Sequence, residues 1–426
     1  MVGRCSNAEL DFVVLKYMGN EVERLRIKRY ILGFASTGSG HYYALLALAS
    51  EIRLAEPCSR IEVLDVLGAK TSFGSRLIRG AWGAMSTVWF LRPLYRALYR
   101  LLLGNTSTSS LIAWLTTFFA KYNFAKSPLQ VDHFIALHSA AIPCGLALKR
   151  RTGCRLSVVA TDYVFHNLHC HSEVDEYFVP VCCTTLGRKP SEAIRSGRVR
   201  YRAIPIDSRF LNGFYARPPI DGNDFRVLVS FGAAGLRGIH SVRLISCLLR
   251  STSETVKYTL VAGNDHKLYR EFLSIQATDL GRLRVSVFGL VENMADLMRS
   301  SHILVGKSGG LTVTEARHVG LPIAIVDALP GQEEFNRDLV VSEKSGISVN
   351  DPSLLIRFIS QLREPSEWLR WSNAARSSGA AAYAVTSITA PELKSDRRAG
   401  NSLGGTRGSR RSGLSTVPRA PVLLDR

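Results

Sequence analysis

The sequence predicts an α/β protein in which two doubly wound units meet at a cleft. Short apolar segments typical of buried strands alternate with segments of helical periodicity, and such alternation is typical of parallel sheets. Two of the predicted strands lead directly into a glycine-rich loop that opens a helix, and a third such junction follows later in the chain. With 426 residues the chain is long enough for two medium-sized domains, each with its own core.

The first unit opens at residues 29–34, an apolar run that predicts a strand. The loop Gly38-Ser39-Gly40-His41 follows, and residues 42–55 have helical periodicity. A later apolar run at residues 157–160 predicts another strand of the same sheet. We therefore expect an N-terminal extension over residues 1–29 and a first domain over residues 30–215.

The second unit repeats this order of elements. Residues 225–230 predict a strand, the loop that follows contains Gly232 and Gly235, and residues 240–249 predict a helix. Further elements are expected as strands at residues 256–261, 303–305 and 322–326 and as a last helix at residues 365–383.

The junction between the units is predicted near residues 212–223, where Pro218, Pro219 and Gly222 interrupt any regular element. The second domain is then expected over residues 216–390. The remaining residues, 391–426, are rich in Gly, Ser, Arg and Pro and predict a disordered basic tail. That tail is either a solvated segment of no specific role or one that helps to hold an anionic membrane.

The formal net charge of +19 favours a negatively charged partner. Nucleic acid is not expected, because no RNA-binding signature accompanies the charge and the basic residues stand among apolar ones. An anionic membrane surface is the better match. The eight cysteines are scattered without a CxxC pair, which predicts a reducing, cytosolic compartment. No signal peptide and no spanning segment are recognised, so we expect a protein that lies on the cytosolic face of a membrane without crossing it.

The most informative motif is the junction at residues 303–316. An apolar strand runs into Ser308-Gly309-Gly310 and then into a helix that carries Glu315. Glycines allow close approach of an anion, and a helix N-terminus offers free N–H groups, so the motif suits a diphosphate with a ribose near Glu315. Lys307 and Ser308 resemble the end of a P-loop, but Ser301 stands where that motif requires its first glycine. A tight turn without a ligand is the alternative.

Five motifs occur in a recognisable order along the chain. They are His41 after its glycine loop, residues 161–166 with His171 and residues 174–179, residues 289–294, residues 307–315 and residues 329–336. Together they resemble the monogalactosyldiacylglycerol synthases and the bacterial processive diacylglycerol glucosyltransferases, which are relatives of the peptidoglycan glycosyltransferase that acts on lipid I. The resemblance covers roughly residues 30–385.

The resemblance implies a GT-B fold with two Rossmann-like domains, the UDP-sugar on the C-terminal one and the lipid acceptor at the N-terminal one. It implies an inverting transfer of a hexose from a UDP-hexose to the hydroxyl of diacylglycerol, with no cofactor and no metal in the site. A helix N-terminus and backbone N–H groups can stabilise the leaving diphosphate in place of a metal. The alternatives are the same fold acting on another lipid, such as a polyprenyl-linked sugar, and a catalytically inactive nucleotide-sugar-binding protein.

For the donor, the resemblance implies a role for each of several loop residues. Glu315 is the expected ribose ligand, and Val291 is placed to meet uracil. The diphosphate is assigned to Ser308, Gly309 and Gly310, with Gly232 and Gly235 closing over the phosphates; Gln332 and Glu333 are assigned to the hydroxyls of the donor sugar.

On the acceptor side, His41 is expected to take the proton of the acceptor hydroxyl or to contact the diphosphate, because the pKa of histidine suits proton transfer near neutral pH. The family more often has glycine where Ser39 stands. Asp162 either assists this base or caps a helix or turn. His166 and His171 are assigned to acceptor binding or local structure, since their spacing with His169 and Cys170 fits no usual zinc site.

Residues 73–103 are the expected membrane-facing segment. Arginines and large aromatic residues are interleaved here, a combination that suits the interface of an anionic bilayer. The residues assigned to this contact are Trp82, Trp89, Arg92 and Arg96. A pair of core helices with a basic outer face is the alternative.

Overall fold

The computed structural model describes residues 15–18, 21–24, 27–36, 39–67, 93–94, 96–97, 99, 130–211, 215–219, 224–233, 239–251, 255–278 and 284–383. All of them belong to one compact unit within Met1–Thr389. The predicted tail and four of the predicted site residues, Gly235, Trp82, Trp89 and Arg92, lie outside the described residues.

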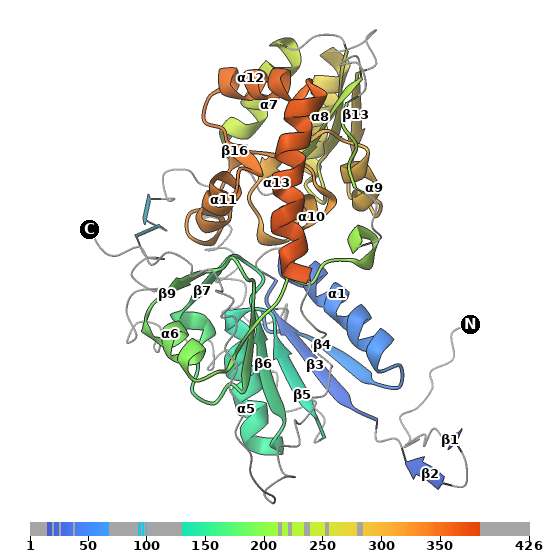
Figure 1. The fold of residues 1–426 in the computed structure, drawn as a ribbon, viewed down its shortest axis with the longest axis vertical. Helices are drawn as coiled ribbons and strands as arrows, with labels where there is room; N and C mark the ends of the chain where they lie inside the picture. Colours follow the sequence, from blue (N-terminus) through green and yellow to red (C-terminus); the bar gives the residue numbers. More distant parts are fainter. Residues whose placement is uncertain are drawn as a thin grey trace, which may run out of the picture. The chain divides into compact units, whose positions relative to one another are not determined.

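The first of two six-stranded sheets is parallel throughout and has the order β10-β8-β6-β5-β3-β4 (Figure 1). Its strands are β3 (Arg29–Phe34), β4 (Arg60–Asp65), β5 (His133–Ala136), β6 (Arg155–Val159), β8 (Glu176–Val179) and β10 (Val199–Tyr201). The helices of this part are α1 (Ser39–Ala55), α5 (Ile142–Thr152) and α6 (Arg188–Arg195), with short 3₁₀ turns η3 (Ser139–Ala141), η4 (Asn167–His169) and η5 (Ser208–Leu211).

Strand β3 shows why this sheet is covered on both faces. Tyr30 and Leu32 pack in one cluster with residues of α1, whereas Ile31, which points the other way, packs with residues of α5. Both faces are therefore buried, as is usual for a parallel sheet, and the strand reads as a continuous apolar run. Two small sheets lie outside this arrangement: antiparallel β1 (Leu15–Met18) and β2 (Glu21–Arg24), and parallel β7 (Val164–His166) and β9 (Thr184–Leu186).

The second large sheet is also parallel, in the order β13-β12-β11-β14-β15-β16. Its strands are β11 (Phe225–Ser230), β12 (Val256–Val261), β13 (Val285–Phe288), β14 (Ile303–Lys307), β15 (Ile323–Asp327) and β16 (Gly346–Ser348). Its helices are α7 (Ile239–Ser251), α8 (His266–Thr278), α9 (Met294–Arg299), α10 (Gly310–Val319), α11 (Gln332–Ser342), α12 (Pro352–Leu362) and α13 (Pro365–Tyr383).

The strand order of the second sheet reverses between β11 and β14. After β11 the chain adds β12 and β13 on one side, and it then returns to place β14 on the other. In doubly wound sheets a ligand crevice opens at such a point, outside the carboxyl ends of the strands. The glycine loops after β11 and β14 therefore lie side by side at the edge where a ligand is expected.

The predicted α/β class and the two parallel sheets are confirmed. The strands predicted at residues 29–34, 225–230 and 256–261 have the bounds of β3, β11 and β12, and those at residues 157–160, 303–305 and 322–326 correspond to β6, β14 and β15 within two residues at each end. In the part of the chain that the structure describes, no helix is both long enough and apolar enough to cross a membrane.

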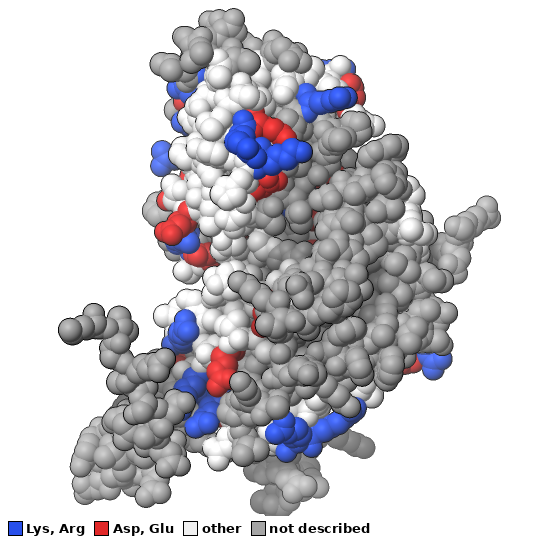
Figure 2. All heavy atoms as spheres, turned by 180° about the vertical axis from the view of Figure 1, so that it is seen from behind, with Lys and Arg blue, Asp and Glu red and all other residues white. Residues whose placement is uncertain are grey.

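Several charged side chains on the described surface form ion pairs. Figure 2 shows Lys and Arg interspersed with Asp and Glu on one face, without a single large basic patch among the coloured residues. Ion pairs among the described residues include Arg150–Glu173 and Arg188–Glu192. Exposed pairs of this kind contribute little to stability, about 0–1 kcal/mol each.

Candidate active site

A pocket of about 470 Å³ lies at the carboxyl ends of the strands of both sheets. One side consists of the start of α1 and the loop after β6; the other consists of the loops after β11, β13, β14 and β15. The predicted site residues that line it are His41, Asp162, Gly232, Val291, Gly309, Gly310, Glu315, Gln332 and Glu333. Residues separated by almost 300 positions in the sequence thus surround one cavity.

Lys307, the last residue of β14, supplies a cation at the pocket wall. Its ammonium group donates to Oε1 of Glu333 at 2.9 Å, and both side chains are largely buried. The second carboxylate oxygen of Glu333 accepts the backbone N–H of Leu329 at 2.9 Å. Both oxygens of Glu333 are therefore engaged within the protein. Sequence reasoning does not assign Lys307 a role, although the lysine stands in the motif that it singles out.

Ser308 holds two loops together and does not line the pocket. The side chain is fully buried, and its hydroxyl donates to the backbone carbonyl of Glu333 at 2.7 Å. Its own carbonyl accepts from the amide of Asn336 at 2.8 Å. These contacts fix the position of the glycine turn relative to the loop at residues 329–334, which we call the donor-sugar loop after the role that the resemblance implies for it.

Asp162 contacts the first turn of α10. Its Oδ1 accepts from Asn336 Nδ2 at 3.0 Å, and the Gly310 backbone N–H also interacts with this carboxyl group. A Cβ at position 310 would lie 2.3 Å from the Thr161 carbonyl oxygen and 2.6 Å from Asp162 Oδ1, so only glycine allows this approach. Burial raises the pKa of Asp162 to about 7, with a further contribution from Glu333. These contacts are those of a helix cap.

His41 lies on the opposite wall, in the first turn of α1. Its Nδ1 is 2.6 Å from Thr161 Oγ1, and its ring meets that of His138 edge-on with centroids 4.7 Å apart. Burial lowers the pKa of His41 to about 4, and the positive charge of Lys307 acts in the same direction. The imidazole is therefore neutral near pH 7 and can accept a proton.

Glu315 lines the pocket one turn into α10. Removal of its carboxyl from bulk water raises the pKa to about 8, and the charge of Asp207 from the segment before η5 raises it further. Arg209, also on the pocket wall, reaches the carbonyl of Glu292 with Nη1, beside Val291. The segment that connects the two sheets thus contributes charged groups to the site.

Three predicted acceptor-side residues lie away from the pocket lining. His166 is buried, and its ring stacks on His169 with centroids 3.9 Å apart. His171 accepts the Glu173 backbone N–H at Nδ1 and so stabilises the local turn. Arg96 forms an ion pair with Glu334 on the outer side of the donor-sugar loop.

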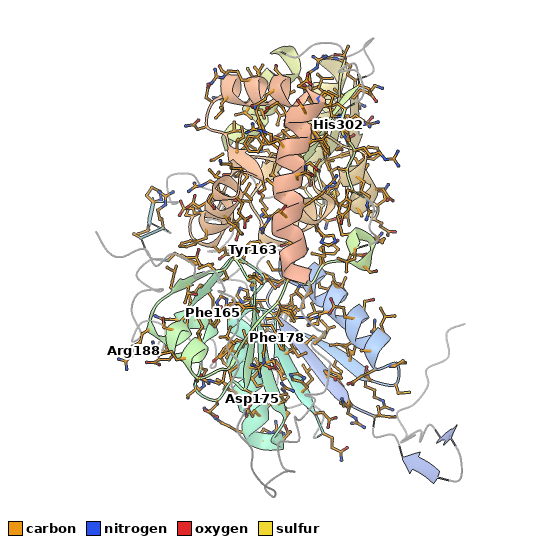
Figure 3. The ribbon with its side chains drawn as sticks, in the orientation of Figure 1. Tyr163, Phe165, Asp175, Phe178, Arg188 and His302 are labelled. Atoms are coloured by element: carbon orange, nitrogen blue, oxygen red, sulfur yellow. The ribbon has the colours of Figure 1, made fainter. Side chains whose placement is uncertain are left out.

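Tyr163 anchors the loop after β6 in the core of the second sheet, where it is 4% exposed. Its backbone N–H donates to Asn336 at 2.9 Å, its hydroxyl lies 2.8 Å from Thr314 Oγ1, and the Arg317 guanidinium lies over its ring. Figure 3 shows Tyr163 apart from Phe165, two residues later in the chain. These long-range contacts place Asp162 against α10.

No group of three or more His, Cys, Asp or Glu side chains that could hold a metal ion occurs among the residues placed by the structure. The Lys307 side chain reaches the glycine turn, since its Cε lies 3.8 Å from an ideal Cβ at Gly309.

Comparison with known proteins points to one group of enzymes. Residues 41–206 match the family model for monogalactosyldiacylglycerol (MGDG) synthase. A processive diacylglycerol beta-glucosyltransferase of Bacillus cereus is 26% identical over 361 residues, which are 80% of this chain and 88% of the relative.

Solved structures agree on the fold. MurG of Acinetobacter baumannii superposes with a TM-score of 0.51 at 14% identity, over 82% of this chain and 95% of that one. Os79 from O. sativa in complex with UDP gives a TM-score of 0.52 at 11% identity, over 83% and 95%. The chain therefore has the GT-B fold and is similar in sequence to the monogalactosyldiacylglycerol synthases and the processive diacylglycerol glucosyltransferases.

Proposed function

We propose that this protein transfers a hexose from a UDP-hexose to the free hydroxyl of diacylglycerol, forming a glycolipid at the cytosolic face of a membrane to which it binds peripherally. The names of the relatives support the reaction and the acceptor. The observation that carries the proposal is the pocket itself, because a neutral histidine from one sheet faces a lysine and a helix N-terminus from the other.

The donor fits the side of the pocket formed by the second sheet. The first turn of α10 and the ammonium group of Lys307 offer positive electrostatic potential to a diphosphate. Glu315 stands one turn further, within the reach of a ribose whose base lies toward Val291. Solved relatives of the same fold bind UDP, as Os79 does, at low sequence identity.

The donor sugar is then placed toward the donor-sugar loop. Gln332 is the residue of that loop whose amide can donate to and accept from sugar hydroxyls. Glu333 contributes through Lys307: the pair fixes the ammonium group, and one carboxylate oxygen holds the loop backbone at Leu329. We therefore assign direct sugar contact to Gln332 and propose that Glu333 binds a sugar hydroxyl only by sharing its carboxylate with these partners.

In the transfer step, the acceptor hydroxyl oxygen attacks the anomeric carbon while the bond from that carbon to the diphosphate oxygen breaks. UDP leaves with the electron pair, and Lys307 with the α10 N-terminus stabilises the charge that develops on it. His41 takes the proton of the hydroxyl, which its neutral imidazole allows near pH 7. Thr161, whose hydroxyl is hydrogen-bonded to His41 Nδ1, orients the imidazole ring.

The acceptor is expected from the N-terminal side. We propose that residues 30–215 form the acceptor domain and residues 216–390 the donor domain, and that the segment at residues 73–103 meets an anionic membrane. Trp82, Trp89 and Arg92 of that segment lie outside the described residues. The formal net charge of the chain, +19, is consistent with attraction to anionic lipid.

A UDP-release assay tests the proposal. Purified protein is mixed with UDP-glucose or UDP-galactose and with anionic vesicles that contain or lack diacylglycerol. UDP release that requires diacylglycerol is expected. If UDP release requires a polyprenyl-linked sugar in the vesicles in place of diacylglycerol, the acceptor is that lipid. If the protein binds UDP-hexose but releases no UDP under any condition, it is a nucleotide-sugar-binding protein without catalytic activity.

A further inference from the structure

The donor-sugar loop is held from two sides by different parts of the chain. On its inner side, Lys307 and Leu329 engage the carboxylate of Glu333. On its outer side, Arg96 and Tyr99 contact the loop, and both belong to the segment at residues 73–103 that sequence analysis assigns to the membrane. The two sides of the same loop are thus linked to the donor pocket and to the acceptor-side segment.

Arg96 binds the loop through one carboxylate. Its Nε and Nη2 donate to Oε1 of Glu334 at 2.9 and 2.6 Å. The other oxygen, Oε2, accepts the Gly331 backbone N–H at 3.1 Å, and the Glu334 N–H donates back to the Gly331 carbonyl. The Glu334 side chain is 17% exposed and that of Arg96 is 45% exposed, so the carboxylate is shielded from solvent whereas the guanidinium is partly exposed. The guanidinium is connected to the turn that begins α11.

Tyr99 covers the same turn. Gly331 has a φ of 93°, a conformation that favours glycine, and a Cβ at this position would lie 2.7 Å from the Tyr99 ring. Tyr99 is 8% exposed, and its ring meets that of His166 edge-on at 5.9 Å. The ring therefore fills the space between the acceptor-side histidine and the glycine that precedes Gln332.

We propose that Arg96 and Tyr99 are positioning residues for the donor sugar, which hold the donor-sugar loop in the conformation that presents Gln332 to the pocket. The inference rests on the proposed function, because it assigns the loop to the sugar of a UDP-hexose. A loop with a left-handed glycine gains little rigidity from its own backbone, so contacts from outside must fix it. Fixing it in advance lowers the cost of ordering it when the sugar binds.

The proposal predicts different effects of Arg96 on the binding of UDP-hexose and on the binding of UDP. The contacts expected for UDP come from Lys307, the first turn of α10 and Glu315, none of which touches Arg96. Arg96 binds Glu334 on the outer side of the loop, whereas Lys307 and Ser308 are held by Glu333 on its inner side. Loss of the Arg96 contact therefore weakens the binding of UDP-hexose more than that of UDP. A residue with a merely structural role would alter both ligands together.

The test is calorimetric titration of the full-length protein with UDP and with UDP-glucose and UDP-galactose. We expect Arg96→Ala to weaken whichever of the two UDP-hexoses binds more tightly by about twofold to fivefold, the size typical of a partly exposed ion pair, and to weaken UDP less. Arg96→Lys should recover part of the loss. Gln332→Ala should show the same selectivity, because it removes the sugar contact directly.

A double-mutant cycle with Glu334→Ala isolates the pair. If Arg96 acts through Glu334, the double variant binds UDP-hexose no more weakly than Glu334→Ala alone. Arg188→Ala is the matched control, since Arg188 pairs with Glu192 on α6, away from the loop, as Figure 3 shows. This control should bind both ligands as the unsubstituted protein does.

Three results would overturn the inference. Unchanged UDP-hexose affinity in Arg96→Ala, additive losses in the cycle, or an equal loss for UDP would each mean that Arg96 does not position the sugar. These outcomes leave the proposed function intact. An unsubstituted protein that binds no UDP-hexose would overturn both, whereas one that binds it with the expected Arg96 dependence but forms no glycolipid would overturn the proposed function alone.

Discussion

The ammonium nitrogen of Lys307 lies 2.9 Å from Oε1 of Glu333, and this ion pair joins the end of β14 to the donor-sugar loop at the wall of the pocket. The pair brings a positive charge to the glycine turn of residues 308–310. It also occupies a carboxylate that sequence reasoning assigns to the sugar. The electrostatics of the pocket therefore depend on a residue at the end of a strand as much as on the glycine turn.

Replacement of Lys307 by Gln should weaken UDP binding about tenfold to hundredfold, because one charge-assisted contact to the diphosphate is lost and Glu333 is left without its partner. The measurement is calorimetric titration with UDP. Lys267→Gln, a change of an exposed lysine on α8, is the control and should leave the affinity unchanged. Equal UDP affinity in both variants would remove Lys307 from the site.

Glu315→Ala should abolish the preference for ribose. We expect the unsubstituted protein to bind UDP more tightly than 2′-deoxy-UDP, since the carboxyl group of Glu315 loses a hydroxyl partner in the deoxy ligand. In the variant the two ligands should bind with equal, reduced affinity, about tenfold or more below that of UDP for the unsubstituted protein. A preference that survives the substitution would place the ribose elsewhere.

Asp162 should make UDP-hexose affinity fall as the pH rises. The pKa of its carboxyl group is raised to about 7, so the group is mainly neutral at pH 6 and mainly ionised at pH 8. The ionised form repels a diphosphate at the start of α10, so the protonated form binds the ligand better. Titration with UDP-hexose, whose diphosphate does not titrate in this range, should show this fall.

Asp162→Asn tests the assignment, because the amide does not titrate and the variant should lose the pH dependence that Asp162 contributes. Asp338→Asn, which changes an exposed aspartate on α11, should keep it. An identical pH profile in the unsubstituted protein and in Asp162→Asn would contradict the position that we assign to the diphosphate.

Alanine substitutions at Gly310 and Gly309 should have different effects, the first on stability and the second on UDP affinity. Gly310→Ala places a methyl group 2.3 Å from the Thr161 carbonyl oxygen and should lower the free energy of unfolding by about 1–3 kcal/mol. A Cβ at Gly309 would have no neighbour closer than 3.8 Å, so Gly309→Ala should keep its stability. Thermal denaturation and UDP titration should show that Gly309→Ala loses UDP affinity alone. Unchanged affinity in Gly309→Ala would mean that the diphosphate does not approach this turn.

His302, labelled in Figure 3, should make the protein less stable in acid. Burial lowers its pKa to about 4, and the nearby Arg226 acts in the same direction. The unfolded chain takes up a proton near pH 6.5 whereas the folded chain resists it until about pH 4. The contribution of His302 to stability is therefore full above pH 6.5 and falls by up to about 1.4 kcal/mol per pH unit as the pH drops from 6.5 to 4.

Urea denaturation at pH 7, 6 and 5 measures this slope. His302→Gln should have a smaller slope, and His266→Gln, a change of an exposed histidine on α8, should match the unsubstituted protein. An unchanged slope in His302→Gln would show that this imidazole is not held neutral by the fold.

The sequence predicts the sheets well because each central strand is a short apolar run bounded by a glycine loop. β3 and β11 are of this kind. Because they are buried on both faces, nearly every residue is apolar, and this pattern is recognisable without knowledge of tertiary contacts. The pair β7 and β9 is not predicted, because three-residue strands carry too little pattern.

The sequence predicts which residues line the site, and it does not predict the side-chain contacts among them. Nine of the predicted residues line one pocket, since the carboxyl ends of parallel strands meet at one edge. The environment of Ser308 depends on a loop 25 positions later in the chain, and that of Tyr163 on residues 151 and 173 positions away, so local sequence could not reveal either. The local sequence likewise indicates only a surface arginine at Arg96, because its partner Glu334 lies far away in the chain.

The most direct test of the central claim is the identity of the product. The protein is incubated with anionic vesicles containing diacylglycerol and with UDP-glucose or UDP-galactose, in the presence of EDTA, and the lipids are analysed by mass spectrometry and NMR. We predict one hexosyl-diacylglycerol whose anomeric configuration is inverted relative to the donor, and its absence in His41→Ala. UDP-hexose binding with no glycosylated lipid from either donor would contradict the assignment of this pocket to glycolipid synthesis.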